Sequence, residues 1–148
     1  LDIANGMINL HHVWMLHRDL KSLNVLLKME NNEIRGYVCD FGESVSVKDI
    51  DSGFVECPFW LPPEVISNRK WSTKSDVYAF GVILWEMSTR KRPYDGKFAA
   101  EVQKEIISGK RLSMNRSSPL KGVVEMCWKQ EPEERPEFTE IYKVLKAL

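Results

Sequence analysis

Apolar residues recur at helical spacing from Leu1 to Leu10, so that they share one face of the segment. This pattern predicts an amphipathic helix that ends near His12. A second pattern runs from Val77 to Met87, where "VYAFGVILWEM" is apolar on nearly every face. A helix that is hydrophobic all round is normally buried, so this run predicts the central helix of the domain. Residues Thr73 to Asp76, directly before it, have the form of a capping box.

Three further helices are expected in the second half of the chain. Residues Phe98 to Ser108 form one, and Gly109 stands where a glycine commonly ends a helix. Ser118 and Pro119 begin the next helix, because serine and proline favour the first positions. The last helix carries apolar residues on one face from Phe138 to Leu148.

Strand patterns are confined to a short stretch of the first half. Val25–Leu27 and Gly36–Cys39 are predicted as two strands, with the polar run "ENNE" at residues 30–33 as the turn between them. Residues Gly42 to Gly53 are polar and weakly periodic, which favours a long surface loop. The predicted fold is therefore mainly α, with one small β-hairpin.

Composition narrows the possible functions. The 148 residues suffice for one domain with a core, and 21 Lys and Arg balance 21 Asp and Glu. A net charge of zero gives no general attraction to nucleic acid, and no apolar run approaches the roughly 18 residues of a membrane span. Cys39, Cys57 and Cys127 have no paired or metal-binding spacing, which favours a reducing, cytoplasmic location.

The stretch "LHRDLKSLNVLL", residues 16–27, concentrates groups that suit phosphoryl transfer. Asp19 can accept a proton from a hydroxyl, Lys21 can neutralise a phosphoryl oxygen, and Asn24 can offer an amide oxygen to a divalent cation. Downstream, "CDFG" places Asp40 directly after a predicted strand, where a carboxylate suits Mg²⁺. A base, a cation and metal ligands are the main requirements of phosphoryl transfer. The alternative is a polar loop with solvated charges.

The motifs "HRDLKSLN", "DFG" and "PPE", in this order, resemble the signature of eukaryotic protein kinases. "KSDVYAFGVILWEM" is similar to the central buried helix of kinases, and "MCWKQEPEERPEF" to their last two helices. The resemblance covers essentially all of residues 1–148 and implies the C-terminal lobe of a kinase domain. A lysine two residues after the base, followed by serine, resembles serine/threonine kinases, particularly the tyrosine-kinase-like group.

The resemblance implies roles for several residues of these motifs and of the segments around them. Asp19 would orient or deprotonate the substrate hydroxyl, and Lys21 would contact the γ-phosphate of ATP. Asn24 and Asp40 would hold Mg²⁺. The residues under the adenine or beside the triphosphate would be Leu26 and Cys39, and those that support the site would be His17, Phe41, Gly42, Glu64, Asp76 and Arg135, with Glu64 paired to Arg135.

Regulation is also implied by the resemblance. Arg18 would be free to receive a phosphorylated activation loop, although a plain salt bridge is the alternative for this residue. The available acceptors are Ser44, Ser46 and Ser52, and the sequence does not distinguish among them. Cys57 stands where serine/threonine kinases usually have a threonine, whose hydroxyl would bridge the base and the lysine. A thiol is a weaker hydrogen-bonding group, so the base would be oriented less firmly.

Part of the kinase pattern is not found in these residues. The eight glycines include no G-x-G pair, and no lysine precedes Lys21. The N-terminal β lobe is therefore expected to be absent, and the first residues, which begin inside a helical pattern without Met, suggest a fragment. The expected function is ATP-dependent phosphorylation of protein serines and threonines by a longer kinase, with the fragment alone inactive. The alternatives are a pseudokinase-like scaffold and an inactive partial gene product.

Overall fold

Six α-helices account for most of the regular structure in the described part of the chain, which comprises residues 1–51, 53 and 57–148 of a computed structural model. They confirm the mainly helical fold predicted from the sequence. Their bounds are Asp2–His12 (α1), Pro63–Asn68 (α2), Thr73–Thr89 (α3), Ala99–Ile107 (α4), Lys121–Cys127 (α5) and Phe138–Lys146 (α6).

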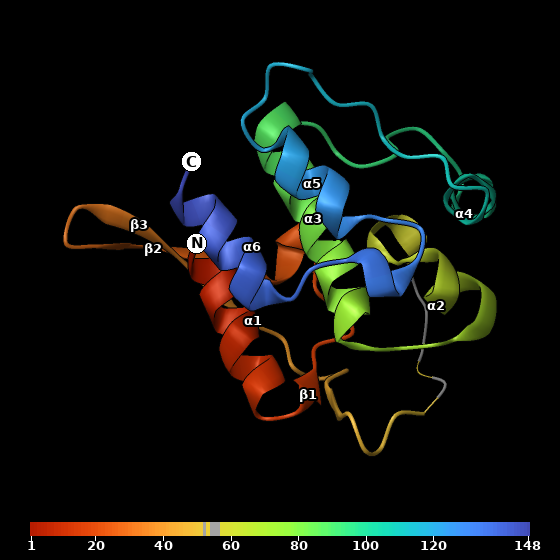
Figure 1. Cartoon of the computed structure of the whole chain (residues 1–148), viewed down its shortest axis with the longest axis horizontal. Helices are drawn as coiled ribbons and strands as arrows, with labels where there is room; N and C mark the ends of the chain where they lie inside the picture. The colour runs from red at the N-terminus through yellow and green to blue at the C-terminus, as the bar shows by residue number, and fades with distance from the viewer. Residues whose placement is uncertain (52, 54–56) are drawn as a thin grey trace.

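Helix α3 is the central element, with α1, α5 and α6 on one side and α2 and α4 toward the other (Figure 1). Every residue from Ser75 to Trp85 is buried, as the continuous apolar run predicted. A Cβ at Gly81 would lie 2.7 Å from the Cβ of Cys127, so only glycine permits this approach of α3 to α5. Among the described residues, no helix combines the length and hydropathy needed to cross a bilayer.

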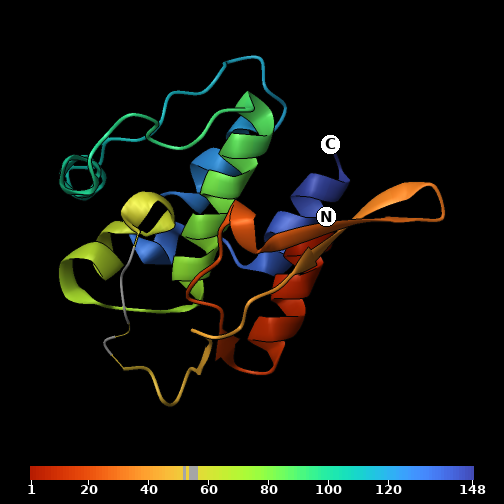
Figure 2. The same cartoon turned by 180° about the vertical axis from the view of Figure 1, so that it is seen from behind.

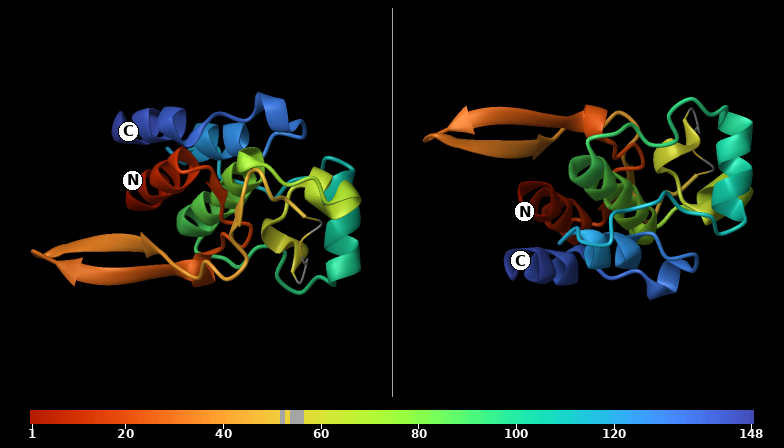
Figure 3. Two further views of the ribbon diagram at one scale, coloured as in Figure 1. Left: turned by 90° about the horizontal axis from the view of Figure 1, so that it is seen from below. Right: turned by 90° about the horizontal axis from the view of Figure 1, so that it is seen from above.

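The helix ends differ from the predicted ones by a few residues. The N-cap of α3 is Ser72, whose side chain accepts the Lys74 N–H and which forms a capping box with Ser75, one residue earlier than predicted. Helix α5 begins at Lys121, because Ser118 forms a turn in which its carbonyl accepts the Lys121 N–H. Helices α1 and α6 lie side by side, with both chain termini near their ends (Figures 1 and 3).

The predicted hairpin is present and longer than expected. Strands β2 (Val25–Glu30) and β3 (Glu33–Val38) are antiparallel, with Val25 opposite Val38. Asn31 and Asn32 turn the chain with φ values of 49° and 64°, which asparagine tolerates well. The hairpin projects from the helical body (Figures 2 and 3).

A second strand pair was not predicted. Strand β1 (Met15–Leu16) pairs antiparallel with β4 (Val45–Ser46), inside the stretch expected to be an irregular loop. Two-residue strands are too short to leave an alternating pattern in the sequence. This pair holds the segment after "DFG" against the residues that precede the "HRD" motif.

Candidate active site

The loop with the "HRD" motif is anchored on the first turn of α3. The Asp76 carboxylate accepts the backbone N–H groups of His17 and Arg18, each at 3.0 Å. His11 Nε2, at the end of α1, lies 2.8 Å from the same carboxylate. Asp76 is 2% exposed and His17 is fully buried, so these bonds are shielded from water. One buried side chain thus connects α1, α3 and the loop.

His17 also connects this loop to the "DFG" segment. Its Nε2 lies 3.1 Å from the carbonyl oxygen of Cys39, and its ring centroid lies 5.2 Å from that of Phe41. The Cys39 N–H donates to the carbonyl of Asn24 at 3.0 Å. Residues 17–24 and 39–41 therefore form one connected site, although the hairpin of β2 and β3 lies between them in the sequence. Each strand of this hairpin has six residues.

Asp19, Lys21 and Asn24 converge within hydrogen-bonding distance. Lys21 Nζ lies 2.8 Å from Asp19 Oδ2, and Asn24 Nδ2 donates to the same oxygen at 2.9 Å. Asn24 Nδ2 also donates to the Asp19 backbone carbonyl at 2.8 Å. One carboxylate oxygen is thus held by two donors. These two contacts fix the orientation of the Asp19 carboxylate.

The oxygen donors of Asn24 and Asp40 fit a magnesium ion. The Asn24 amide nitrogen is used by Asp19, so its oxygen remains for a cation, and the Asp40 carboxylate is exposed. Asp40 has φ 63°, and its Oδ1 is 3.4 Å from the Gly42 N–H. In the described ranges no three His, Cys, Asp or Glu residues gather as a metal cage. Mg²⁺ usually takes only one or two protein carboxylates together with substrate phosphates, which matches this set.

The remaining predicted residues lie around this centre. Leu26 is 59% exposed at the base of β2, and Cys39 is half-buried. The Ser44 hydroxyl donates to the carbonyl of His17 at 3.4 Å, while Ser46 Oγ accepts a backbone N–H at 3.2 Å. Ser52 lies outside the described residues.

Cys57 does not bridge the base and the lysine in the described part of the chain. Asp19 and Lys21 contact each other directly, and neither has a hydrogen bond to the thiol. The half-buried Cys57 precedes the short 3₁₀ turn at Pro58–Trp60.

Arg18 does not present a free guanidinium, and the expectation that it would be free was wrong. Its NH1 lies 2.5 Å from Asp51 Oδ1, and its Nε donates to the carbonyl of Glu43 at 2.6 Å. The salt bridge weighed as the alternative is therefore the observed state. No sequence motif marks Asp51 as the partner of Arg18, because the two residues are 33 positions apart in the chain.

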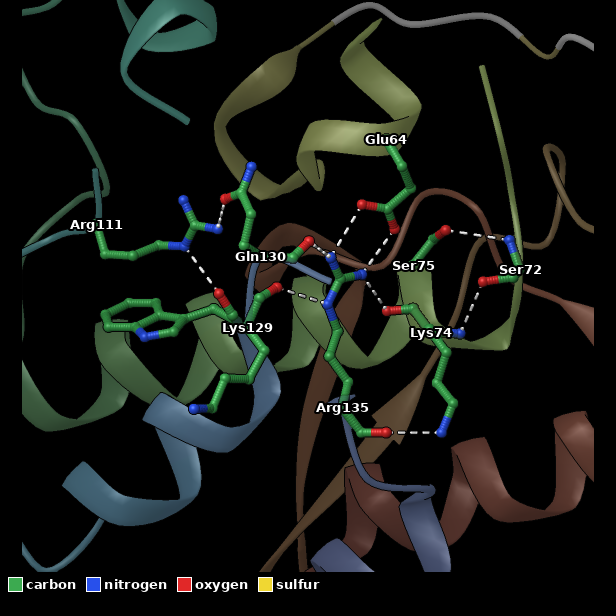
Figure 4. Close-up of polar contacts among 9 residues, drawn as sticks. Glu64, Ser72, Lys74, Ser75, Arg111, Lys129, Gln130 and Arg135 are labelled. Carbon is green, nitrogen blue, oxygen red and sulfur yellow. Dashed lines mark hydrogen bonds and ion pairs between the residues drawn. The ribbon is translucent and has the colours of Figure 1, made fainter. Parts of the chain in front are cut away.

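A buried ion pair ties α2 to the chain before α6 (Figure 4). Arg135 donates to both carboxylate oxygens of Glu64, at 2.7 and 2.9 Å. The same guanidinium donates to the backbone carbonyls of Lys74, Lys129 and Gln130. The Arg135 side chain is fully buried, so all of its charge is compensated inside the protein. Glu64 and Arg135 are thus brought together as the resemblance implied.

Comparison with known proteins identifies the protein family of this chain. Residues 1–145 match the family described as protein tyrosine and serine/threonine kinase. The chain belongs to this family. In Dictyostelium discoideum, a probable serine/threonine-protein kinase, roco8, is 39% identical over 158 residues, covering 99% of this chain and 8% of that protein.

Other relatives of the kinase chain differ widely in length. The probable serine/threonine-protein kinase pats1, also of Dictyostelium discoideum, is 43% identical over 151 residues, covering 95% of this chain and 5% of that protein. The serine/threonine/tyrosine-protein kinase HT1 of Arabidopsis thaliana is 34% identical over 151 residues, covering 99% and 38%. The kinase chain therefore spans less than a tenth of roco8 and pats1 and under two fifths of HT1.

A pocket of about 440 Å³ lies beside the end of the loop with the "HRD" motif and is lined by the carboxylate of Glu86, which no sequence motif predicted. Glu86, near the end of α3, accepts the Ser22 hydroxyl and the Trp60 indole N–H, each at 2.9 Å. Burial raises the pKa of Glu86 above its ordinary value of 4.5, because desolvation outweighs these two hydrogen bonds. The pocket is also lined by Leu23, Cys57, Phe59 and Tyr94.

This raised pKa predicts a pH dependence of stability. Folding favours the protonated form of Glu86, so its contribution is complete below pH 4.5 and is lost as pH rises through the raised pKa. Glu86→Gln cannot ionise, so its stability is expected to fall less than that of the wild type as the pH rises from 4.5 through the raised pKa of Glu86. Hydrogen exchange of the α3 amides measures this difference. The exposed Glu133→Gln should follow the wild type, and identical pH profiles for Glu86→Gln and wild type would contradict the assignment.

Proposed function

We propose that this chain is part of a longer kinase that transfers the γ-phosphate of ATP to serine and threonine hydroxyls of protein substrates. The observation that carries the proposal is the convergence of Lys21 Nζ and Asn24 Nδ2 on Asp19 Oδ2, at 2.8 and 2.9 Å. The names of roco8 and pats1, both probable serine/threonine-protein kinases, support the choice of acceptor.

The chemistry proposed for these residues is an in-line displacement. The substrate oxygen forms a bond to the γ-phosphorus while the bond from that phosphorus to the ADP oxygen breaks, and the hydroxyl proton passes to Asp19. Lys21, adjacent to Asp19, would neutralise charge on the transferred group. Asn24 and Asp40 would hold Mg²⁺, which when bound offsets the negative charge of the phosphates.

The proposed substrates require more chain than these residues. Leu26 and Cys39 would form only the lower face of the nucleotide site, and the sequence contains neither a G-x-G pair nor a lysine before Lys21. The upper face and the contacts to the α- and β-phosphates would come from an N-terminal lobe of the same protein. The 148 residues alone are therefore expected not to transfer phosphate. An intracellular, cytoplasmic location remains part of the proposal.

A pseudokinase-like scaffold is the second candidate. It is favoured by Cys57, which makes no hydrogen bond to Asp19 or Lys21 among the described residues. The direct contact between those two side chains argues for turnover, because the base is oriented without help from residue 57.

The test is a transfer assay on the full-length protein. The protein is incubated with Mg²⁺ and γ-labelled ATP and with three peptide pools that contain serine, threonine or tyrosine as the only hydroxyl residue. We expect label on the serine and threonine pools and none with the isolated 148 residues. Label on the tyrosine pool would extend the acceptors to tyrosine, which is also part of the name of HT1. Binding of Mg²⁺·ATP without transfer would favour the scaffold, and rapid transfer by the isolated chain would contradict the requirement for a second lobe.

A further inference from the structure

The pocket beside the loop with the "HRD" motif is formed where three segments meet. The first is the short 3₁₀ turn Ser22–Asn24, the second is the 3₁₀ turn Pro58–Trp60, and the third is the end of α3 together with residues 92–97. Its volume of about 440 Å³ is within the range of pockets that hold small ligands. The chemistry proposed for phosphoryl transfer uses none of the side chains that line it.

The first of these turns is anchored on both sides of Leu23. The Ser22 hydroxyl donates to Glu86 at 2.9 Å, and the Asn24 amide donates to Asp19 at 2.9 Å. Ser22 and Asn24 are thereby held against the protein, whereas Leu23 between them is 77% exposed. A leucine this exposed at a pocket offers apolar surface that stays in contact with water until another group covers it.

Aromatic side chains form another wall of the pocket. The centroid of the Phe59 ring lies 6.3 Å from that of Trp60 and 6.1 Å from that of Tyr94, and both pairs are tilted. Tyr94 is 6% exposed and Pro93 beside it is buried, so this wall is part of the packed protein. A side chain that fills the pocket therefore contacts Leu23 and aromatic rings, which favours an apolar side chain.

The charges around the pocket give little attraction for a cationic side chain. Among the described residues that line it, two are acidic and two are basic, namely Glu86, Asp95, Arg92 and Lys97. Both oxygens of Glu86 already accept hydrogen bonds, from Ser22 and Trp60, and burial raises the pKa of this carboxyl. Asp95 is exposed, so water weakens its attraction. A lysine or arginine in the pocket would therefore lose hydration for little electrostatic gain.

A peptide whose hydroxyl lies at Asp19 can reach this pocket. Consecutive Cα atoms are about 3.8 Å apart, so the Cα atoms of Asp19 and Leu23 are separated by at most about 15 Å. An extended peptide covers that distance in about five residues. A substrate residue no more than about five positions from the acceptor can therefore occupy the pocket.

We propose that this pocket selects protein substrates that carry a large apolar side chain within about five positions of the acceptor serine or threonine, and that Leu23 sets this selection. The inference rests on the proposed function, because it names a substrate class for the same reaction. The apolar side chain of the substrate covers Leu23 and the aromatic wall, and its burial strengthens binding of the correct peptide. Since Ser22 and Asn24 connect the pocket to Asp19, binding there also orients the acceptor.

The test compares peptides on the full-length protein. A serine acceptor stands in an alanine background, and a single leucine, glutamine or lysine is placed in turn at each of about five positions on either side. We expect leucine at one or more positions to raise kcat/KM by about tenfold over lysine. Leu23→Glu should remove this preference, because it places a charge beside the pocket, and Leu23→Met should keep it. Each ratio is taken within one variant, so a general loss of activity cancels.

A matched control makes the same chemical change elsewhere. Val13→Glu introduces an acid in place of an apolar residue that is 62% exposed and does not line the pocket, and it should keep the wild-type preference. Equal kcat/KM for leucine and lysine peptides at every position would overturn the proposal while the proposed function stands. A leucine preference that Leu23→Glu leaves unchanged would overturn it as well.

A second measurement does not depend on catalysis. Labelled peptides with alanine in place of the serine are titrated with the full-length protein, and fluorescence anisotropy gives their Kd. At one or more positions the leucine peptide should bind about tenfold more tightly than the lysine peptide, in wild type and Leu23→Met but not in Leu23→Glu. If no peptide is phosphorylated and this difference is still found, the proposed function alone has failed. Equal Kd values for the two peptides in the wild type at every position would overturn the selection by the pocket.

Discussion

Replacement of Asp19 by Asn is expected to reduce kcat for phosphoryl transfer by about 10³-fold in the full-length protein, because a carboxamide cannot take the proton of the attacking hydroxyl. The KM for ATP should change by no more than about twofold, since Asp19 acts on the acceptor and makes no nucleotide contact in the proposed chemistry. Steady-state kinetics with a peptide acceptor, at saturating and at limiting ATP, separate these two parameters.

The variant should fold normally, which keeps this test interpretable. Lys21 Nζ and Asn24 Nδ2 donate to Asp19 in the wild type, and the amide oxygen of Asn can accept from both. Asp49→Asn makes the same chemical change at an exposed position and should retain full activity. A loss of less than about tenfold in Asp19→Asn would mean that another group takes the proton. A large rise in KM with unchanged kcat would instead assign Asp19 to binding.

Long-period apolar patterns explain why the helical core could be predicted. The run from Val77 to Met87 is apolar on nearly every face because all residues of α3 from Ser75 to Trp85 are buried, and Met87, near the end of the helix, is 53% exposed. Helices α1 and α6 are amphipathic because each buries only part of its surface: α1 packs against α6 and β3, and α6 packs against α1 and α5. These long helices are stabilised by burial of apolar residues, and the buried faces produce the apolar periodicity from which the helices could be predicted.

Short elements show no such periodicity in the sequence. Helix α2 has six residues, which is fewer than two helical turns and too short to show an apolar periodicity. Strands β1 and β4 have two residues each, which is too few for an alternation to be seen. The predicted cap of α3 was one residue late, because Ser72 and Thr73 are both good N-cap residues and only the backbone geometry chooses between them.

In the candidate site, residues that are close in the sequence could be predicted to lie together, whereas partners far apart in the sequence could not. Asp19, Lys21 and Asn24 lie within six positions of one another, so their order and spacing indicated a common site. Glu86 and Asp51 reach the same region from 64 and 33 residues away from their partners Ser22 and Arg18. Neither carboxylate belongs to a local pattern, because their positions depend on how α3 and the loop after "DFG" fold back onto the catalytic loop.

The second large effect expected is on stability, from Arg135→Ala. This change removes the partner of Glu64, which is 12% exposed, and the donors to the carbonyls of Lys74, Lys129 and Gln130. Breaking a buried pair on one side typically costs about 3–5 kcal/mol. Hydrogen exchange of the α3 amides in the full-length protein should accelerate by about 100-fold or more, since each 1.4 kcal/mol of opening free energy is a factor of about ten. Arg116→Ala, at an exposed position, is the matched control and should change exchange very little.

A double variant separates the ion pair from the backbone contacts. If the cost of Arg135→Ala came only from the unpaired Glu64 carboxylate, then Glu64→Gln combined with Arg135→Ala would recover most of the stability. The geometry predicts little recovery, because three backbone carbonyls still lose their donor in the double variant. Lys cannot replace the guanidinium either, since its single ammonium group cannot donate to Glu64 and to three separate carbonyls at once. Full recovery in the double variant would show that Arg135 acts only as a counter-charge, and a persistent loss would identify it as the group that joins α2, α3 and the chain before α6.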